Sequence, residues 1–197
     1  KEVEVKTEQQ KKKEGEKTIV GFVFPQKKPS IYRSSTKEIK KSSILKQKDF
    51  EQAKKTIDFI KQKKWNSALK SAAKVKDKEF RTLITWMHLK TTRNGASFNA
   101  YKKFIEQNSD YPRIKRIRYL AEEKIYLRNN SPTSVINWFQ KYPPLGGLGK
   151  IKLAEAYLEK GQTDKVKTLI KDGWITALIR KNDLGYYRAK FKKFIDS

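Results

Sequence analysis

The stretch LAEAYLEKGQTDKVKTLIKDGW, residues 153–174, decides the fold that the sequence predicts. Apolar and small residues recur at helical spacing on both sides of Gly161, and glycine is a typical residue just past the end of a helix. Thr163 can begin a second helix, in which Val166 and Ile170 share one face. The stretch therefore predicts two helices joined by a tight turn.

The spacing of this helix pair is that of a tetratricopeptide repeat, with Val166 at a position where a small residue is usual. FIKQKKWNSALKSA, residues 59–72, is a weaker copy of the same hairpin turn. Consecutive helices with short loops pack as antiparallel hairpins, and stacked hairpins bury each other's apolar faces. The predicted fold class is all-α: an α-solenoid of antiparallel helix hairpins, that is, a tetratricopeptide-like superhelix.

Helical spacing continues from Asp49 to the end of the chain and predicts about nine helices and no strand. Pro112 is expected near the first position of one helix, where proline is tolerated. Other helix starts are expected at residues that can cap a helix or open its first turn: Asp49, Asp77, Ser97, Ser131 followed by Pro132, Thr163 and Asn182.

The sequence divides into a tail, residues 1–48, and a helical superhelix, residues 49–197. The tail has low-complexity stretches such as QQKKKEGEK and too few apolar residues to offset the entropy lost on ordering, so we predict a disordered or extended basic tail. One β-prone island, TIVGFVFP at residues 18–25, interrupts it and could bind the folded part or another chain.

The chain is strongly basic, with 47 Lys and Arg against 21 Asp and Glu and a formal net charge of +26. Such a charge attracts polyanions at low salt, whether nucleic acid, anionic lipid or an acidic polymer. The sequence has no cysteine, which excludes disulfides and Cys-based metal sites. No apolar run is long enough to cross a bilayer.

The stretch PPLGGLGK, residues 143–150, ends in Gly-Lys as phosphate-binding loops do. A Walker A motif would need glycine in place of Pro144 and a hydroxyl residue in place of Ile151, and it would follow a strand. Prolines also remove backbone N–H groups that a phosphate would need. We therefore predict a corner between two helices and no bound nucleotide.

Candidate catalytic and metal-binding residues are few. His88 is the single histidine and lies among apolar helical positions, which predicts a packing role and no metal site. Two pairs of carboxylates, Glu106 with Asp110 and Glu122 with Glu123, are interpreted as ion-pair partners in a lysine-rich chain and not as catalytic groups. The sequence predicts no catalytic residue, no metal and no cofactor.

The best basic patch lies in YPRIKRIRYLAEEK, residues 111–124. It contains Arg113, Lys115, Arg116 and Arg118 beside two tyrosines. Lysines are nevertheless spread over every predicted helix, and the aromatic residues stand at core positions instead of forming stacking platforms. This distribution favours a solvated surface over a nucleic-acid site.

Five sequence elements occur in a fixed order: Trp65 opening an alanine-rich helix, Trp86, FIEQNSDYP at 104–112, Trp138-Phe139 through Gly161, and Gly173-Trp174. Their order resembles the N-terminal superhelical part of soluble lytic murein transglycosylases, over residues 49–197. Ser109-Asp110-Tyr111 departs from the family's usual sequence, while the following proline is kept.

The resemblance implies a bacterial, periplasmic cell-wall protein. The family are peptidoglycan lyases that cleave the bond between N-acetylmuramic acid and N-acetylglucosamine, leaving a 1,6-anhydro product, with one Glu of a separate lysozyme-like domain as acid and base. No motif of that domain is present, so we expect a non-catalytic portion truncated at its C-terminal end. Glycan strands are the expected partners, and the four basic residues of the patch are candidates to face them. Two alternatives stay open: a tetratricopeptide-like scaffold for protein interactions, and a basic nucleic-acid-binding helical protein.

Overall fold

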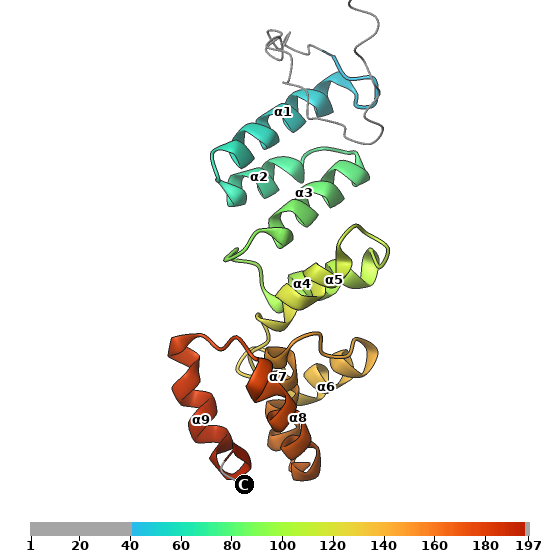
Figure 1. Ribbon diagram of the computed structural model, residues 1–197. Coiled ribbons are helices and arrows are strands. Elements are labelled where there is room, and N and C mark those ends of the chain that lie inside the picture. The colour runs from blue at the N-terminus through green and yellow to red at the C-terminus, as the bar shows by residue number, and fades with distance from the viewer. Residues whose placement is uncertain (1–40, 196–197) are drawn as a thin grey trace, which may run out of the picture. The chain divides into compact units, whose positions relative to one another are not determined.

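A computed structural model describes residues 41–195, and this part of the chain is all-helical. The described residues belong to one compact unit. Most of the predicted tail, including the island at 18–25, lies outside the described residues. The helices, shown in Figure 1, are α1 (Gln47–Lys61), α2 (Trp65–Ala72), α3 (Lys78–Lys90), α4 (Phe98–Gln107), α5 (Ile114–Glu122), α6 (Pro132–Lys141), α7 (Gly147–Glu159), α8 (Thr163–Thr176) and α9 (Lys181–Ile195).

Several predicted helix starts are confirmed by their hydrogen bonds. Asp77 caps α3, since its carboxylate accepts from the backbone N–H of Phe80 at 2.6 Å. The hydroxyls of Ser97 and Ser131 accept equivalent bonds at α4 and α6, and α6 has its proline in the first turn. Gly161 has φ of +72°, the left-handed conformation that glycine adopts most easily after a helix.

Two predicted helix starts were wrong. Asp49 does not cap α1, which begins at Gln47, and its carboxylate instead accepts from the backbone N–H of Lys76 at 3.3 Å. Pro112 precedes α5 by two residues, because Arg113 takes a left-handed φ of 58° before the helix begins. In both cases a contact or backbone conformation outside the helix decides where it begins. The last helix begins at Lys181, one residue before the expected Asn182.

Helices that are consecutive in sequence pack against each other at most junctions. The pairs with contacts are α1 with α2, α2 with α3, α3 with α4, α4 with α5, α6 with α7, α7 with α8 and α8 with α9. Helix α5 also contacts α3 and α7. Figure 1 follows this succession from α1 to α9. Among the described helices, none is long and apolar enough to cross a membrane.

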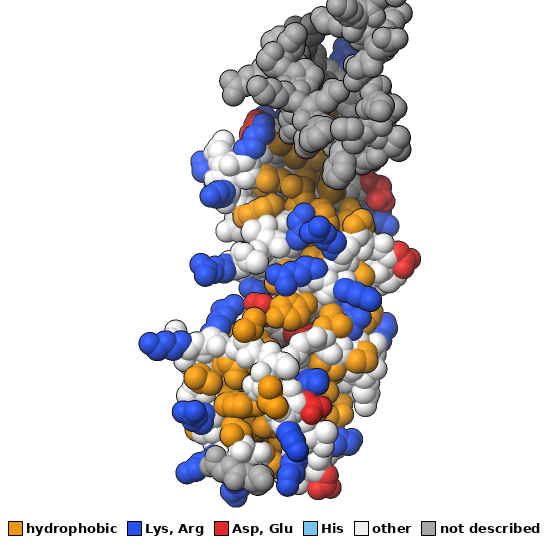
Figure 2. Space-filling model, in the orientation of Figure 1, with side chains coloured by type: hydrophobic (Ala, Val, Ile, Leu, Met, Phe, Trp, Pro, Cys, Tyr) orange, Lys and Arg blue, Asp and Glu red, His pale blue; other side chains and the backbone are white. Residues whose placement is uncertain are grey.

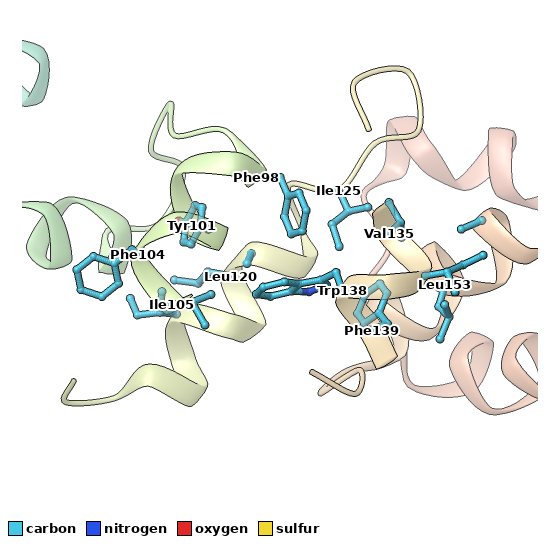
Figure 3. Packing of buried hydrophobic residues seen from close by; sticks show 14 of the residues in the cluster. Phe98, Tyr101, Phe104, Ile105, Leu120, Ile125, Val135, Trp138, Phe139 and Leu153 are labelled. Atoms are coloured by element: carbon cyan, nitrogen blue, oxygen red, sulfur yellow. The ribbon is translucent and has the colours of Figure 1, made fainter. Parts of the chain in front are cut away.

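An aromatic core joins α3 to α7. Trp138 on α6 is 4% exposed, and its ring meets that of Phe98 on α4 edge-on with centroids 5.4 Å apart. Such edge-to-face pairs stabilise a core beyond the burial of their area. Figure 3 shows Trp138 extending from α6 towards Phe98 and Leu120. This side chain therefore links the α4–α5 pair to α6.

A second core lies between α7, α8 and α9. Its fully buried members include Ile151, Val166 and Phe191. Helices α7 and α8 approach closely where Gly147 and Gly173 meet, since a Cβ on Gly147 would lie closer than 3 Å to backbone atoms of Gly173 and Ala177. The absence of side chains therefore sets how closely these two helices pack.

Candidate functional site

The glycine-rich stretch at 143–150 forms a corner between two helices, as predicted, although only residues 143–146 lie in the corner and residues 147–150 are already the first turn of α7. It follows α6 and leads into α7, which begins at Gly147. The carboxylate of Glu122, on α5, accepts the backbone N–H groups of Leu145 at 2.6 Å and Gly146 at 3.1 Å. Free N–H groups at a helix N-terminus are what binds phosphate in nucleotide loops. Here the protein's own carboxylate takes up two of them.

Glycines make room for this carboxylate. A Cβ on Gly149 would lie closer than 3 Å to the Glu122 carboxyl group, and one on Gly146 would lie 2.8 Å from the ring of Tyr119. Glu122 is only 3% exposed, and burial raises its pKa to about 7, against the opposing effect of the two backbone N–H groups and of Arg118. The neighbouring Glu123 instead pairs with a different residue, so the two glutamates do not form a catalytic pair.

The four basic residues of the predicted patch have different surroundings. Arg118 belongs to the corner: its Nη2 donates to the carbonyl of Pro143 at 3.0 Å. Arg113, Lys115 and Arg116 are exposed. Figure 2 shows basic side chains scattered over the visible face instead of gathered in one stripe. That these residues face a glycan stays a prediction.

The remaining candidate residues from the sequence are His88, Glu106 and Asp110. His88 is 9% exposed, its ring lies 5.3 Å from that of Trp65, and burial together with the charge of Lys124 lowers its pKa. This confirms the predicted packing role. Glu106 and Asp110 are exposed. Across the described residues, no group of His, Cys, Asp and Glu side chains could hold a metal ion.

Sequence reasoning missed a cavity of about 330 Å³. Because its lining comes from three separate segments, no local motif announces it. The signals were the adjacent tyrosines 186 and 187, and charged residues at inward positions of α7. The lining consists of Tyr126, Leu127 and Arg128 between α5 and α6, Glu155 on α7, and Asp183, Tyr186 and Tyr187 on α9. We call this the tyrosine cavity.

Two buried charges of α7 support the tyrosine cavity. Lys152 is 2% exposed, and its Nζ lies 4.0 Å and 5.1 Å from the ring centroids of Tyr126 and Tyr187. Burial lowers the pKa of Lys152 to about 8, although nearby carboxylates oppose this. Glu155 is 3% exposed and accepts from the hydroxyl of Tyr186 and from Lys190 at 3.2 Å.

No protein family, curated protein or solved structure matches this chain. What the protein does therefore has to be inferred from its own residues.

Proposed function

We propose that residues 47–195 form a tetratricopeptide-like superhelix that serves as a non-catalytic scaffold in a bacterial peptidoglycan lytic transglycosylase. The all-helical chain and the pairing of consecutive helices support the superhelix. The location proposed is the periplasm, where such an enzyme meets its substrate. The bond-cleaving glutamate would belong to a separate domain.

The observation that carries this proposal is a contact between two motifs of the resemblance. Nε1 of Trp86 donates to the carbonyl of Pro112 at 2.8 Å, and its ring lies 5.9 Å from that of Tyr111. Residues 104–112 are the turn motif, and Trp86 is the helix motif before it. Residues of two motifs that are distant in the sequence thus hold the α4–α5 pair against α3.

The buried carboxylates support a non-catalytic role. Glu122 is bonded to backbone N–H groups of the corner, and Glu155 to a tyrosine and a lysine. A general acid for glycosidic cleavage has to reach the leaving oxygen from an open cleft. Both side chains are instead engaged inside the protein.

The basic surface supports an electrostatic attraction to peptidoglycan, whose peptide stems carry carboxylates. The exposed residues Arg113, Lys115 and Arg116 are the proposed contact. Interactions between exposed charges weaken as salt screens them. Binding should therefore be salt-dependent.

The test is sedimentation of the purified chain with isolated cell-wall sacculi at rising salt. We expect binding at low salt, loss of most binding by about 0.3 M salt, and no release of 1,6-anhydro fragments. Replacing Arg113, Lys115 and Arg116 together by Gln should weaken binding more than a matched triple replacement of three exposed lysines elsewhere: Lys70, Lys74 and Lys78. Salt-insensitive binding, or fragment release, would contradict the proposal.

A scaffold for protein interactions is the second candidate, and one surface favours it. Ile175 is 82% exposed and lines an apolar cavity of about 280 Å³ together with Trp174 and Phe194, and Leu178, three residues further on, is 80% exposed. Exposed apolar patches often bind partners. Lysines at the same cavity favour an amphipathic helix with acidic flanks. This function predicts that replacing Arg113, Lys115 and Arg116 weakens sacculus binding no more than the matched lysine replacement does.

A further inference from the structure

The tyrosine cavity has the size and lining of a small-molecule site. Its volume, about 330 Å³, is at the lower end of the range of about 300–1,000 Å³ in which proteins bind small ligands. Three tyrosines give it apolar faces and polar hydroxyls. Two carboxylates and one guanidinium share the same lining. Such a cavity suits a ligand of roughly the size of an amino acid.

Two of the lining charges make no close pair, although the carboxylate of Asp183 is near enough to Lys152 to oppose the lowering of its pKa, and the side chain of Arg128 is exposed to solvent. Within residues 41–195, the carboxylate of Asp183 and the guanidinium of Arg128 form neither an ion pair nor a hydrogen bond. Arg128 lies over the ring of Tyr126, with Cζ 4.9 Å from its centroid, which leaves its N–H edge unused. Asp183 is in the first turn of α9, where a negative charge is favourable. That placement explains why it is tolerated and leaves its oxygens available.

Charges of both signs surround the cavity. Arg128 and Lys152 are cations, Asp183 is an anion, and Glu155 is an anion already paired with Lys190. A ligand with a net charge would meet a like charge at close range. A ligand carrying one charge of each sign would meet a partner for both.

We propose that the tyrosine cavity binds an α-amino-acid group, either a free amino acid or the end residue of a peptide. Its carboxylate pairs with Arg128, whose planar fork matches a carboxylate. Its ammonium pairs with the carboxylate of Asp183. This site is independent of the proposed scaffold function.

Other ligand classes fit less well. Phosphate would be repelled by Glu155 and Asp183, and a lone cation by Arg128 and Lys152. A neutral sugar could stack on the tyrosines but would bring no charged group to Asp183 or Arg128. An amino acid satisfies the lining groups more completely than any of these.

The experiment is an NMR titration of the full chain, with signals of Tyr126, Tyr186 and Tyr187 as the readout. The probes are free L- and D-amino acids, with three matched controls: alaninamide, which carries only the cation, N-acetylalanine, which carries only the anion, and N-acetylglucosamine, which is neutral. We expect saturable binding of at least one amino acid and binding of the controls that is weaker by about tenfold or more.

Variants then assign the contacts. Arg128→Gln and Asp183→Asn should each weaken amino-acid binding by about tenfold or more. Arg116→Gln is the matched control for arginine, because its guanidinium also lies over a tyrosine ring, at 5.2 Å. Asp164→Asn is the matched control for aspartate, since it is in the first turn of α8. Both controls should change binding less than about twofold.

Three results would overturn the proposal: no saturable shift with any amino acid up to about 10 mM, tighter binding of N-acetylglucosamine than of amino acids, or equal binding by site and control variants. Circular dichroism establishes that each variant is folded. Since sacculus binding is measured separately, failure of one proposal leaves the other standing or falling on its own assay.

Discussion

The helix pairs α1–α2 and α7–α8 both pack closely, but by different means. Between α1 and α2, the buried hydroxyl of Thr56 donates to Oγ of Ser71 at 2.8 Å, and the amide of Gln52 donates to the same oxygen at 2.6 Å. Between α7 and α8, Gly147 and Gly173 bring the backbones together. One contact depends on satisfied hydrogen bonds, and the other on the absence of side chains.

Because of this difference, we expect substitutions to destabilise the two helix pairs to different extents. A buried hydroxyl can be removed at the cost of leaving its partners unsatisfied, which is a modest loss. A methyl group placed against backbone creates a steric clash that cannot be relieved locally, because the backbone of a packed helix pair cannot rotate aside as a side chain can. Substitutions at Gly147 and Ser71 distinguish a steric clash from the loss of hydrogen bonds.

The largest effect is expected for Gly147→Ala. Its new Cβ would lie closer than 3 Å to backbone atoms of α8 and of Ala177, so α7 and α8 would have to separate. We expect a loss of about 3 kcal/mol or more in the free energy of unfolding, measured by urea denaturation.

Gly185→Ala is the matched control, because nothing lies within 4 Å of a Cβ at that position of α9. Alanine is the better helix former, so this change should stabilise the protein by about 0.5–1 kcal/mol. If both changes had the same effect, the close approach of α7 and α8 would be refuted.

The next effect concerns Glu122 and pH. Because the folded pKa, about 7, is raised above the ordinary 4.5, its stabilising contribution is complete below pH 4.5 and is lost as pH rises through about 7. Glu122→Gln removes this titration. Between these limits, the wild type should lose about 2–3 kcal/mol of unfolding free energy relative to the variant. Parallel pH profiles of the two proteins would count against a buried carboxyl.

The smallest effect is expected in the hydroxyl-bonded pair. Ser71→Ala removes the acceptor shared by Thr56 and Gln52, and should cost about 1–2 kcal/mol. Ser67→Ala on the same helix is the control: its side chain makes no hydrogen bond to the described residues, and the change should stay within about 0.5 kcal/mol. A loss at Ser71 as large as that at Gly147 would erase the contrast between the pairs.

Local signals in the sequence predicted much of the fold. Caps such as Asp77, Ser97 and Ser131 act within one helical turn, so their positions alone identify them. The predicted helix cap at Asp49 was wrong: its carboxylate accepts from the backbone N–H of Lys76, in the turn after α2, and no local sequence pattern reveals this contact.

The candidate site was harder to predict because its contacts are long-range. The sequence identified the glycine-rich corner, but not the carboxylate that closes it, since Glu122 and Leu145 are 23 positions apart. Glu155 meets Tyr186 from 31 positions away. Helical periodicity predicts that such residues face inward, but it does not predict which residues they contact.

The glycine-rich corner is closed by the protein's own carboxylate, that of Glu122. The most direct test is a ¹³C NMR titration of the Glu122 carboxyl group, with and without millimolar ATP and Mg²⁺. We expect a pKa of about 7 that the nucleotide leaves unchanged. A pKa near 4.5, or saturable shifts of the Leu145 and Gly146 amides on adding nucleotide, would contradict it.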